Sequence, residues 1–113
     1  MNEADAKVLL GQMLDAERQA RAYVQDMTAE EFLADKRTQQ AVTLNLIIIG
    51  EVATRLMDRH PETVAAHPQI EWRAMRGMRN RIAHGYYDID MHVVWETAAR
   101  ALPELEECLR RAS

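Results

Sequence analysis

Residues 78–87 gather arginine, asparagine, histidine and tyrosine side chains that could act together on a phosphate group. His84 could exchange protons near neutral pH, because an unperturbed imidazole titrates there. Arg79 and Arg81 could stabilise the negative charge that develops on phosphorus in a transition state. Asn80 could orient a phosphate oxygen or the histidine ring. These residue types make phosphoester chemistry a hypothesis for this stretch.

The local distribution of charge is compatible with phosphoester chemistry in this stretch. The chain has a formal net charge of −4, yet residues 72–87 carry four arginines, including Arg76, and no acidic residue. The arginine side chain presents a planar fork of donors to a phosphate, whereas lysine is a point charge. Tyr86 and Tyr87 end this basic window and could stack on a base or present a hydroxyl group. The acidity of the whole chain, taken alone, argues against nucleic-acid binding.

Arg79 and His84 are five residues apart, which is a rotation of about 140° on an α-helix. The two side chains therefore leave the helix in different directions, and a two-fold dimer could bring two copies of the pair into one cleft. In the structural alternative, Arg79 pairs with an acid and His84 caps the helix C-terminus, where an imidazolium is favoured. The residues alone leave both interpretations open.

The elements around this stretch are predicted to be helices. Glycine and proline are scarce, with four and three copies, and apolar residues recur every three or four positions. Thr28 and Glu31 form a capping box, which predicts a further short helix. The other predicted helices cover residues 6–27, 36–59 and 70–83 and a C-terminal segment with an apolar stripe over residues 94–109. We expect an all-α, four- to five-helix antiparallel bundle formed by residues 1–113 as a single domain.

Three local expectations go with this bundle. Residues 44–53 are apolar on more than one helix face, which suggests in so small a domain that a second subunit covers one face. Gly85 could take the left-handed conformation that often follows a helix. Pro103 should kink or split the last helix.

The remaining candidates point to structure rather than chemistry. Trp72 and Trp95 are predicted to be core residues. Glu51 is either partly exposed or a buried partner for an arginine, with Arg55 or the arginines of the basic window as candidates. Cys108 is the single cysteine and reads as a small core residue, so no internal disulfide and no cysteine-pair zinc site is expected.

Metal and membrane sites are also not expected. His60, His67 and His92 form no metal-ligand pair with an acidic partner at helical spacing, so we expect no metal. The longest apolar run is far shorter than a membrane span, and residues 1–7 lack the apolar region of a signal peptide. We therefore expect a cytoplasmic protein without a membrane partner.

Arg79, four residues, His84, one residue and Tyr86 match the Arg-x4-His-x-Tyr signature of the HepT-like proteins, which are small members of the HEPN superfamily. The resemblance covers nearly the whole chain, including residues 32–37, 48–52, 72–80 and 88–95. It implies a HEPN-like, homodimeric all-α toxin of a toxin–antitoxin pair that acts as a metal-independent RNase without a cofactor. It also implies a partner, an MntA-type minimal nucleotidyltransferase, which transfers AMP from ATP onto Tyr86.

The residues are compatible with what the resemblance implies. Two His84 side chains across a dimer axis could serve as base and acid. Arg79 would supply the cation, with Arg81, Asn80 and Arg76 in supporting or RNA-binding roles on a tRNA or mRNA substrate. This mechanism predicts 2′,3′-cyclic phosphate ends.

A second hypothesis is a non-catalytic dimeric module that binds the nucleotidyltransferase or a nucleotide in the same cleft. A plain structural helical domain would leave the clustered arginine, histidine and tyrosine side chains unexplained.

Overall fold

The computed structural model describes residues 3–112, and every regular element in that range is helical. The elements are α1 (Glu3–Val24), α2 (Ala29–Leu33), α3 (Lys36–Arg59), α4 (Pro61–Ala66), α5 (Trp72–His84), the 3₁₀ turn η1 (Tyr86–Asp88), α6 (Met91–Glu96), the π-helical turn η2 (Thr97–Ala101) and α7 (Leu102–Ala112). This confirms the predicted all-α class and the predicted compact helical bundle.

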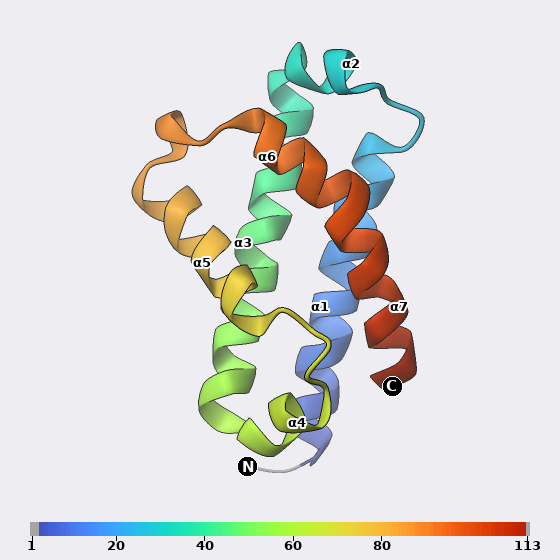
Figure 1. The fold of residues 1–113 in the computed structure, drawn as a ribbon, viewed down its shortest axis with the longest axis vertical. Helices are drawn as coiled ribbons and strands as arrows, with labels where there is room; N and C mark the ends of the chain where they lie inside the picture. Colours follow the sequence, from blue (N-terminus) through green and yellow to red (C-terminus); the bar gives the residue numbers. More distant parts are fainter. Residues whose placement is uncertain (1–2, 113) are drawn as a thin grey trace.

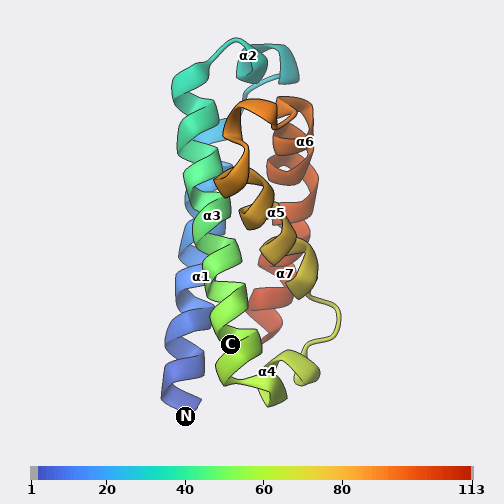
Figure 2. The same cartoon turned by 90° about the vertical axis from the view of Figure 1, so that its left-hand side faces the viewer.

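The two long helices, α1 and α3, run antiparallel and side by side (Figure 1). Helix α5 packs along α3, and Figure 2 shows both helices from the side on which α5 lies. The C-terminal segment crosses from α3, which α6 contacts, to α1, which η2 and α7 contact. Helix α3 therefore lies centrally, between α1 and the helix that carries the candidate site residues.

Local signals set the helix bounds. The capping box forms as predicted, with the Thr28 hydroxyl accepting from the Glu31 amide and the Glu31 carboxylate accepting from the Thr28 amide. The bounds of α3 are the predicted ones, because Asp35 caps its first turn and Pro61 follows its end. Helix α1 ends three residues earlier than predicted, and Asp26, at φ 64°, turns the chain towards α2.

The expectation for Gly85 is wrong. Its φ is −163°, which is extended rather than left-handed backbone. The Gly85 amide still donates to the Arg81 carbonyl (3.1 Å) and completes α5, while its own carbonyl accepts from the Asp88 amide (2.9 Å). The chain therefore passes directly from α5 into the turn η1, without a left-handed residue between them.

Pro103 splits the last helix, as predicted. A proline inside a helix has no amide hydrogen and cannot donate to the carbonyl four residues earlier. The backbone widens into the π-helical turn η2 immediately before α7, which contains Pro103 near its start. Segments α6, η2 and α7 therefore form one interrupted helix.

The core lies between the helices and includes both tryptophans, as predicted. Trp72 is buried and its indole Nε1 donates to the His67 carbonyl (3.1 Å). Trp95 is partly buried, and its ring lies 5.5 Å from that of Phe32, measured between centroids. Cys108 is partly buried against the same core.

Helix α3 is both the most central helix and an incompletely covered one. Its length and composition would allow it to cross a membrane, but half of its most apolar stretch is buried among the other helices, as in the core helix of a bundle. On its outer face Leu44 remains 57% exposed and Ile48 37% exposed. These two residues leave part of the helix's apolar surface in water.

Candidate functional site

The site begins with a close approach of α3 and α5 at Gly50. A Cβ atom at this position would lie 2.3 Å from Cβ of Arg79 and 2.7 Å from the carbonyl oxygen of Met75. Both distances are far below van der Waals contact, so only a glycine fits here. The missing side chain lets α5 lie directly on α3 and places the start of the Arg79 side chain against the α3 backbone.

This approach brings Arg79 to two polar residues of α3. Its Nη1 donates to Glu51 Oε1 in an ion pair, and its Nη2 donates to Thr54 Oγ1 (3.4 Å). The Arg79 side chain is 21% exposed and that of Glu51 is 44% exposed. Within residues 3–112, Arg79 Nε is buried and has no hydrogen-bond partner. We call this contact of Glu51 with Arg79 the α3–α5 pair.

The α3–α5 pair selects one of the predicted partners for Glu51. Arg55, one turn further along the same helix, is exposed, whereas Arg79 of the basic window makes the contact. The same contact agrees with the first part of the structural alternative, in which Arg79 pairs with an acid. Gly50 and Thr54 complete the surroundings of Arg79 and were not foreseen, since no local pattern shows which residues of α3 face α5.

His84 lies at the other end of this arrangement. It is exposed and is the last residue of α5. Because Arg79 faces α3 and the helix rotates by about 140° between the two positions, one chain does not bring the two side chains together. Its position as the last residue of α5 is also compatible with the capping interpretation.

The supporting residues are spread around α5. Arg76 is partly buried, and it lies three residues before Arg79 and four before Asn80, which puts all three on neighbouring positions of one face. Arg81 is exposed and lies three residues before His84, further around the helix. The predicted site therefore divides into a part beside α3 and a part that faces solvent.

The two tyrosines occupy different environments on the turn η1. Tyr86 is partly buried against the core, whereas Tyr87 is 99% exposed. Their ring centroids lie 5.8 Å apart and the ring planes meet at 75°, so the rings make an edge-to-face contact. The sequence put both tyrosines next to His84 but did not show which ring packs inward.

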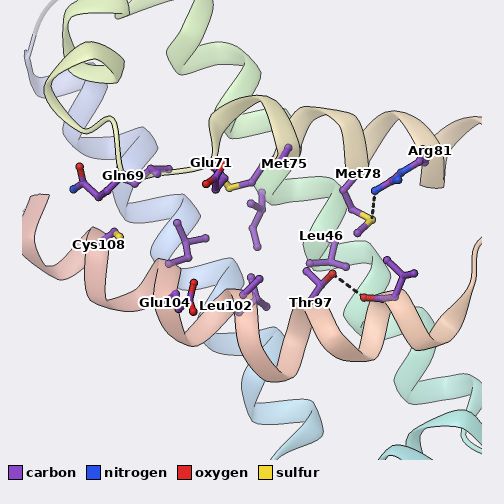
Figure 3. Close-up of a pocket in the computed structure, with 16 residues that line it drawn as sticks. Leu46, Gln69, Glu71, Met75, Met78, Arg81, Thr97, Leu102, Glu104 and Cys108 are labelled. Carbon is purple, nitrogen blue, oxygen red and sulfur yellow. Dashed lines mark hydrogen bonds between the residues drawn. The ribbon is translucent and has the colours of Figure 1, made fainter.

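A groove of about 380 Å³ lies on another side of α5, between this helix and the interrupted C-terminal helix (Figure 3). Its floor includes Leu46 of α3, and Met75 and Met78 line it from α5. Arg81 lies at one end of the groove, where its Nη2 lies 3.9 Å from Sδ of Met78. Arg79 does not line the groove, which is therefore separate from the α3–α5 pair.

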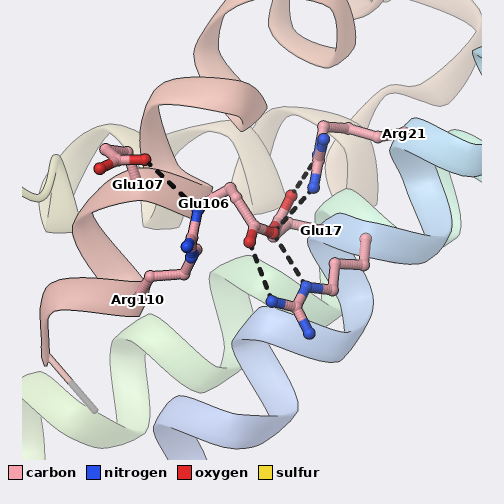
Figure 4. Close-up of polar contacts among 6 residues, drawn as sticks. Glu17, Arg21, Glu106, Glu107 and Arg110 are labelled. Atoms are coloured by element: carbon pink, nitrogen blue, oxygen red, sulfur yellow. Dashed lines mark hydrogen bonds and ion pairs between the residues drawn. The ribbon is translucent and has the colours of Figure 1, made fainter.

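A second arginine–carboxylate contact, which the sequence analysis missed, joins α1 to α7 (Figure 4). We call it the α1–α7 cluster; it consists of Glu17, Arg18, Arg21 and Glu106. Arg18 binds Glu106 through Nε and Nη2, each at 2.9 Å. Arg21 donates to both carboxylates at 2.7 Å, through Nε to Glu17 and through Nη2 to Glu106.

Burial gives the two carboxyl groups of this cluster opposite shifts. Glu17 is fully buried, and this burial, together with a hydrogen bond shared with Glu106, raises the pKa of Glu17 to about 7. The arginine Arg18, with a further hydrogen bond from Glu17, lowers the pKa of Glu106. The cluster is a buried structural contact between α1 and α7, in which Glu17 Oε2 has no hydrogen-bond partner among residues 3–112. Among residues 3–112, no group of three histidine, cysteine, aspartate or glutamate side chains is placed to hold a metal ion.

The family model and the similar proteins named below agree on one family. Residues 13–112 match the family described as "Ribonuclease HepT-like". A Methanocaldococcus jannaschii protein named "Putative RNase MJ0127" is 30% identical over 114 residues, covering 97% of this chain and 92% of the relative. The "Probable ribonuclease HepT" of Thermococcus cleftensis is 36% identical over 84 residues, or 74% of each chain. No solved structure matches the chain.

Proposed function

Because the chain belongs to the HepT-like ribonuclease family, we propose that it is the toxin of a toxin–antitoxin pair and cleaves RNA without a metal ion. One observation carries this proposal. Arg79 of the Arg-x4-His-x-Tyr motif is held in place by α3 and keeps a partly exposed side chain, while His84 of the same motif is exposed at the end of α5. A fixed cation and an accessible imidazole are what phosphodiester cleavage requires.

The active form of this enzyme is a two-fold homodimer. One chain does not bring Arg79 and His84 together, whereas two copies across an axis can supply both residues to one cleft. Leu44 and Ile48 support this arrangement, because they are exposed apolar residues on the same face of α3 as Glu51, at spacings of four and three residues. A partner subunit seated on this face would cover both residues beside the α3–α5 pair.

The reaction is a transesterification within the RNA strand. One His84 removes the proton of a ribose 2′-hydroxyl, whose oxygen attacks the adjacent phosphorus. The bond to the 5′-oxygen of the next nucleotide breaks as the second His84 donates a proton to that oxygen. Arg79, with Arg81, stabilises the added negative charge, and Arg76 and Asn80 contact the strand. The products are a 2′,3′-cyclic phosphate and a 5′-hydroxyl.

An MntA-type nucleotidyltransferase neutralises the toxin. The Tyr86 hydroxyl oxygen attacks the α-phosphorus of ATP, pyrophosphate leaves, and AMP remains joined to the tyrosine. Tyr86 lies two residues after His84, so the modification adds bulk and negative charge beside the exposed imidazole. Both effects oppose the binding of a polyanionic RNA.

The deciding experiment compares cleavage of tRNA and mRNA in excess EDTA by the wild type, His84→Ala and His92→Ala. His92 is the matched control, because it is also an exposed histidine but lies outside the motif, on α6. Intact mass first establishes that the tyrosines are unmodified. We expect cyclic phosphate ends, a fall of at least about 100-fold for His84→Ala, and no comparable change for His92→Ala. Cleavage that leaves 3′-hydroxyl ends would exclude the mechanism.

A second candidate is the non-catalytic module that binds a nucleotide or the nucleotidyltransferase. The α3–α5 pair favours it in one respect, because Glu51 already neutralises much of the Arg79 charge. In that case unmodified wild type cleaves neither RNA, while the wild type and His84→Ala bind the nucleotidyltransferase equally.

A further inference from the structure

Among the large apolar and aromatic side chains of residues 3–112, that of Tyr87 is the most exposed. It is 99% exposed, whereas Tyr23, the other exposed tyrosine, is 46% exposed. A ring that contacts so little of its own chain adds nothing to the core. Its position, on the turn that follows the last residue of α5, places it three residues after His84. Three residues span at most about 11 Å, so the ring lies within reach of whatever His84 binds.

Backbone hydrogen bonds define the turn from which this ring projects. The Asp88 amide donates to the Gly85 carbonyl (2.9 Å), and the Ile89 amide donates to the Tyr86 carbonyl (3.1 Å). Tyr86 packs against the core and touches the Tyr87 ring with an edge-to-face contact at 5.8 Å. The partly buried tyrosine therefore supports the exposed one from the side, while the rest of the Tyr87 ring stays open to solvent.

Charge indicates which part of an RNA strand would meet this ring. The basic residues of the window lie before it, on α5, whereas exposed Asp88 and Asp90 follow it. Phosphates are attracted to the arginines and repelled by the two carboxylates. A strand whose phosphates lie over α5 would therefore present a base, rather than its backbone, to the turn.

We propose that Tyr87 is a stacking platform for a nucleobase next to the phosphate that is cleaved. This inference rests on the proposed function and adds a binding subsite to it. Protein aromatic rings bind unpaired bases by stacking, which tolerates any base because each has a π-face. The subsite would select single-stranded or looped RNA, in which a base can leave its neighbours and lie on the ring.

The test measures binding separately from cleavage. The probe is a fluorescein-labelled single-stranded 12-mer of 2′-O-methyl ribonucleotides, which lacks the attacking hydroxyl, and the readout is fluorescence anisotropy with unmodified protein. Tyr87→Ala should bind about tenfold more weakly than wild type, because it removes the aromatic ring on which a base would stack. Tyr87→Phe keeps the ring and should restore wild-type affinity. Tyr23→Ala, which removes an exposed tyrosine from α1, is the control and should bind as the wild type does.

A second probe identifies the contact as a base. For a 12-mer with the same backbone but without bases, Tyr87→Ala and wild type should bind equally. An equal loss on both probes, or a Tyr87→Phe variant as weak as Tyr87→Ala, would overturn the stacking platform. If wild type cleaves RNA through His84 but Tyr87→Ala binds the first probe normally, this inference alone fails. If wild type neither binds nor cleaves RNA, the proposed function fails with it.

Discussion

The α1–α7 cluster and the α3–α5 pair both join a later helix to one of the two long helices, but they differ in how far their carboxyl groups are exposed. In the cluster, two arginines meet two carboxyl groups, and Glu17 has no exposed surface. In the pair, a single arginine meets a carboxylate that is 44% exposed, and Arg79 Nε has no hydrogen-bond partner among the described residues. Each contact leaves one buried atom without a hydrogen-bond partner among residues 3–112, Glu17 Oε2 in the cluster and Arg79 Nε in the pair, so the contrast lies in the greater exposure of the pair's carboxylate.

This difference in exposure distinguishes a structural contact from a candidate binding site better than charge alone does. Both contacts contain arginine and glutamate from two helices, and the cluster has the larger number of charges. The pair involves α5, the helix that ends at the exposed His84, and it borders the exposed apolar residues Leu44 and Ile48 of α3. A binding role is expected where the ionic contact orients a cation without satisfying it completely.

We expect the largest effect from adding a side chain at Gly50, where α5 lies directly on α3. Gly50→Ala places a Cβ atom 2.3 Å from Cβ of Arg79, so α5 must move away from α3. We expect the free energy of unfolding to fall by about 3 kcal/mol, the upper part of the usual cost of overpacking. Urea denaturation followed by circular dichroism measures the change.

Gly11→Ala in α1 is the matched control. No atom lies within 4 Å of a Cβ at that position, and alanine is the better helix former by up to about 1 kcal/mol. We expect an unchanged or slightly raised stability. If Gly50→Ala were as stable as Gly11→Ala, the close contact of the two helices would be wrong.

The contrast between these glycines shows what the sequence could predict. The bounds of α3 and the capping box at Thr28 follow from neighbouring residues, and both were predicted correctly. Gly50 and Gly11 look alike locally, because each is a single glycine within a helix. Only the packing of α5 on α3 distinguishes them, and that packing depends on residues about thirty positions apart in sequence.

The candidate site was predictable to the same extent. The motif residues could be identified by type and spacing. For Glu51 the sequence left open a partly exposed residue or a buried partner of an arginine, with Arg55 and the arginines of the basic window as candidates. The α1–α7 cluster was missed because Glu17 and Glu106 lie far apart along the chain and neither has a distinctive local pattern. The different exposures of Tyr86 and Tyr87 also depend on tertiary packing. The approach of two Arg79–His84 pairs stays a prediction, since it requires a second chain.

The next effect tests whether the α3–α5 pair orients a functional cation. Glu51→Gln keeps the shape of the side chain but removes its charge, so the guanidinium of Arg79 is held less firmly. We expect kcat for RNA cleavage to fall about tenfold, which corresponds to about 1.4 kcal/mol in the transition state, with little change in KM. The free energy of unfolding should change by less than about 1 kcal/mol, since the pair is partly exposed.

Glu30→Gln is the control, because it removes an exposed glutamate from α2, away from α5. Single-turnover kinetics separate the chemical step from binding for both variants. A merely structural Glu51 would lower stability and leave kcat of the folded fraction unchanged, and that result would contradict the positioning role.

The smallest effect concerns the α1–α7 cluster and its pH dependence. The pKa of Glu17 is raised in the folded protein, from 4.5 to about 7, mainly by burial. The bound proton therefore stabilises the fold fully below pH 4.5, and this contribution is lost as the pH rises through about 7. Between pH 5 and 8 we expect wild type to lose at least about 1 kcal/mol through this group, because one pKa unit corresponds to 1.36 kcal/mol.

Glu17→Gln tests this linkage, because the amide stays neutral and can replace the protonated carboxyl group in its hydrogen bonds. Urea midpoints at pH 5, 6, 7 and 8 should show that the stability of wild type declines relative to the variant as the pH rises. Glu107→Gln, an exposed neighbour on α7, should keep the wild-type pH dependence. The lowered pKa of Glu106 acts in the opposite sense and only in acid, where its stabilising charge is lost as the pH falls, so this pH range isolates Glu17. Parallel curves for wild type and Glu17→Gln would mean that the buried carboxyl group is ionised throughout. The cluster would then resemble the α3–α5 pair in charge, and the contrast between structural contact and candidate site would rest on exposure alone.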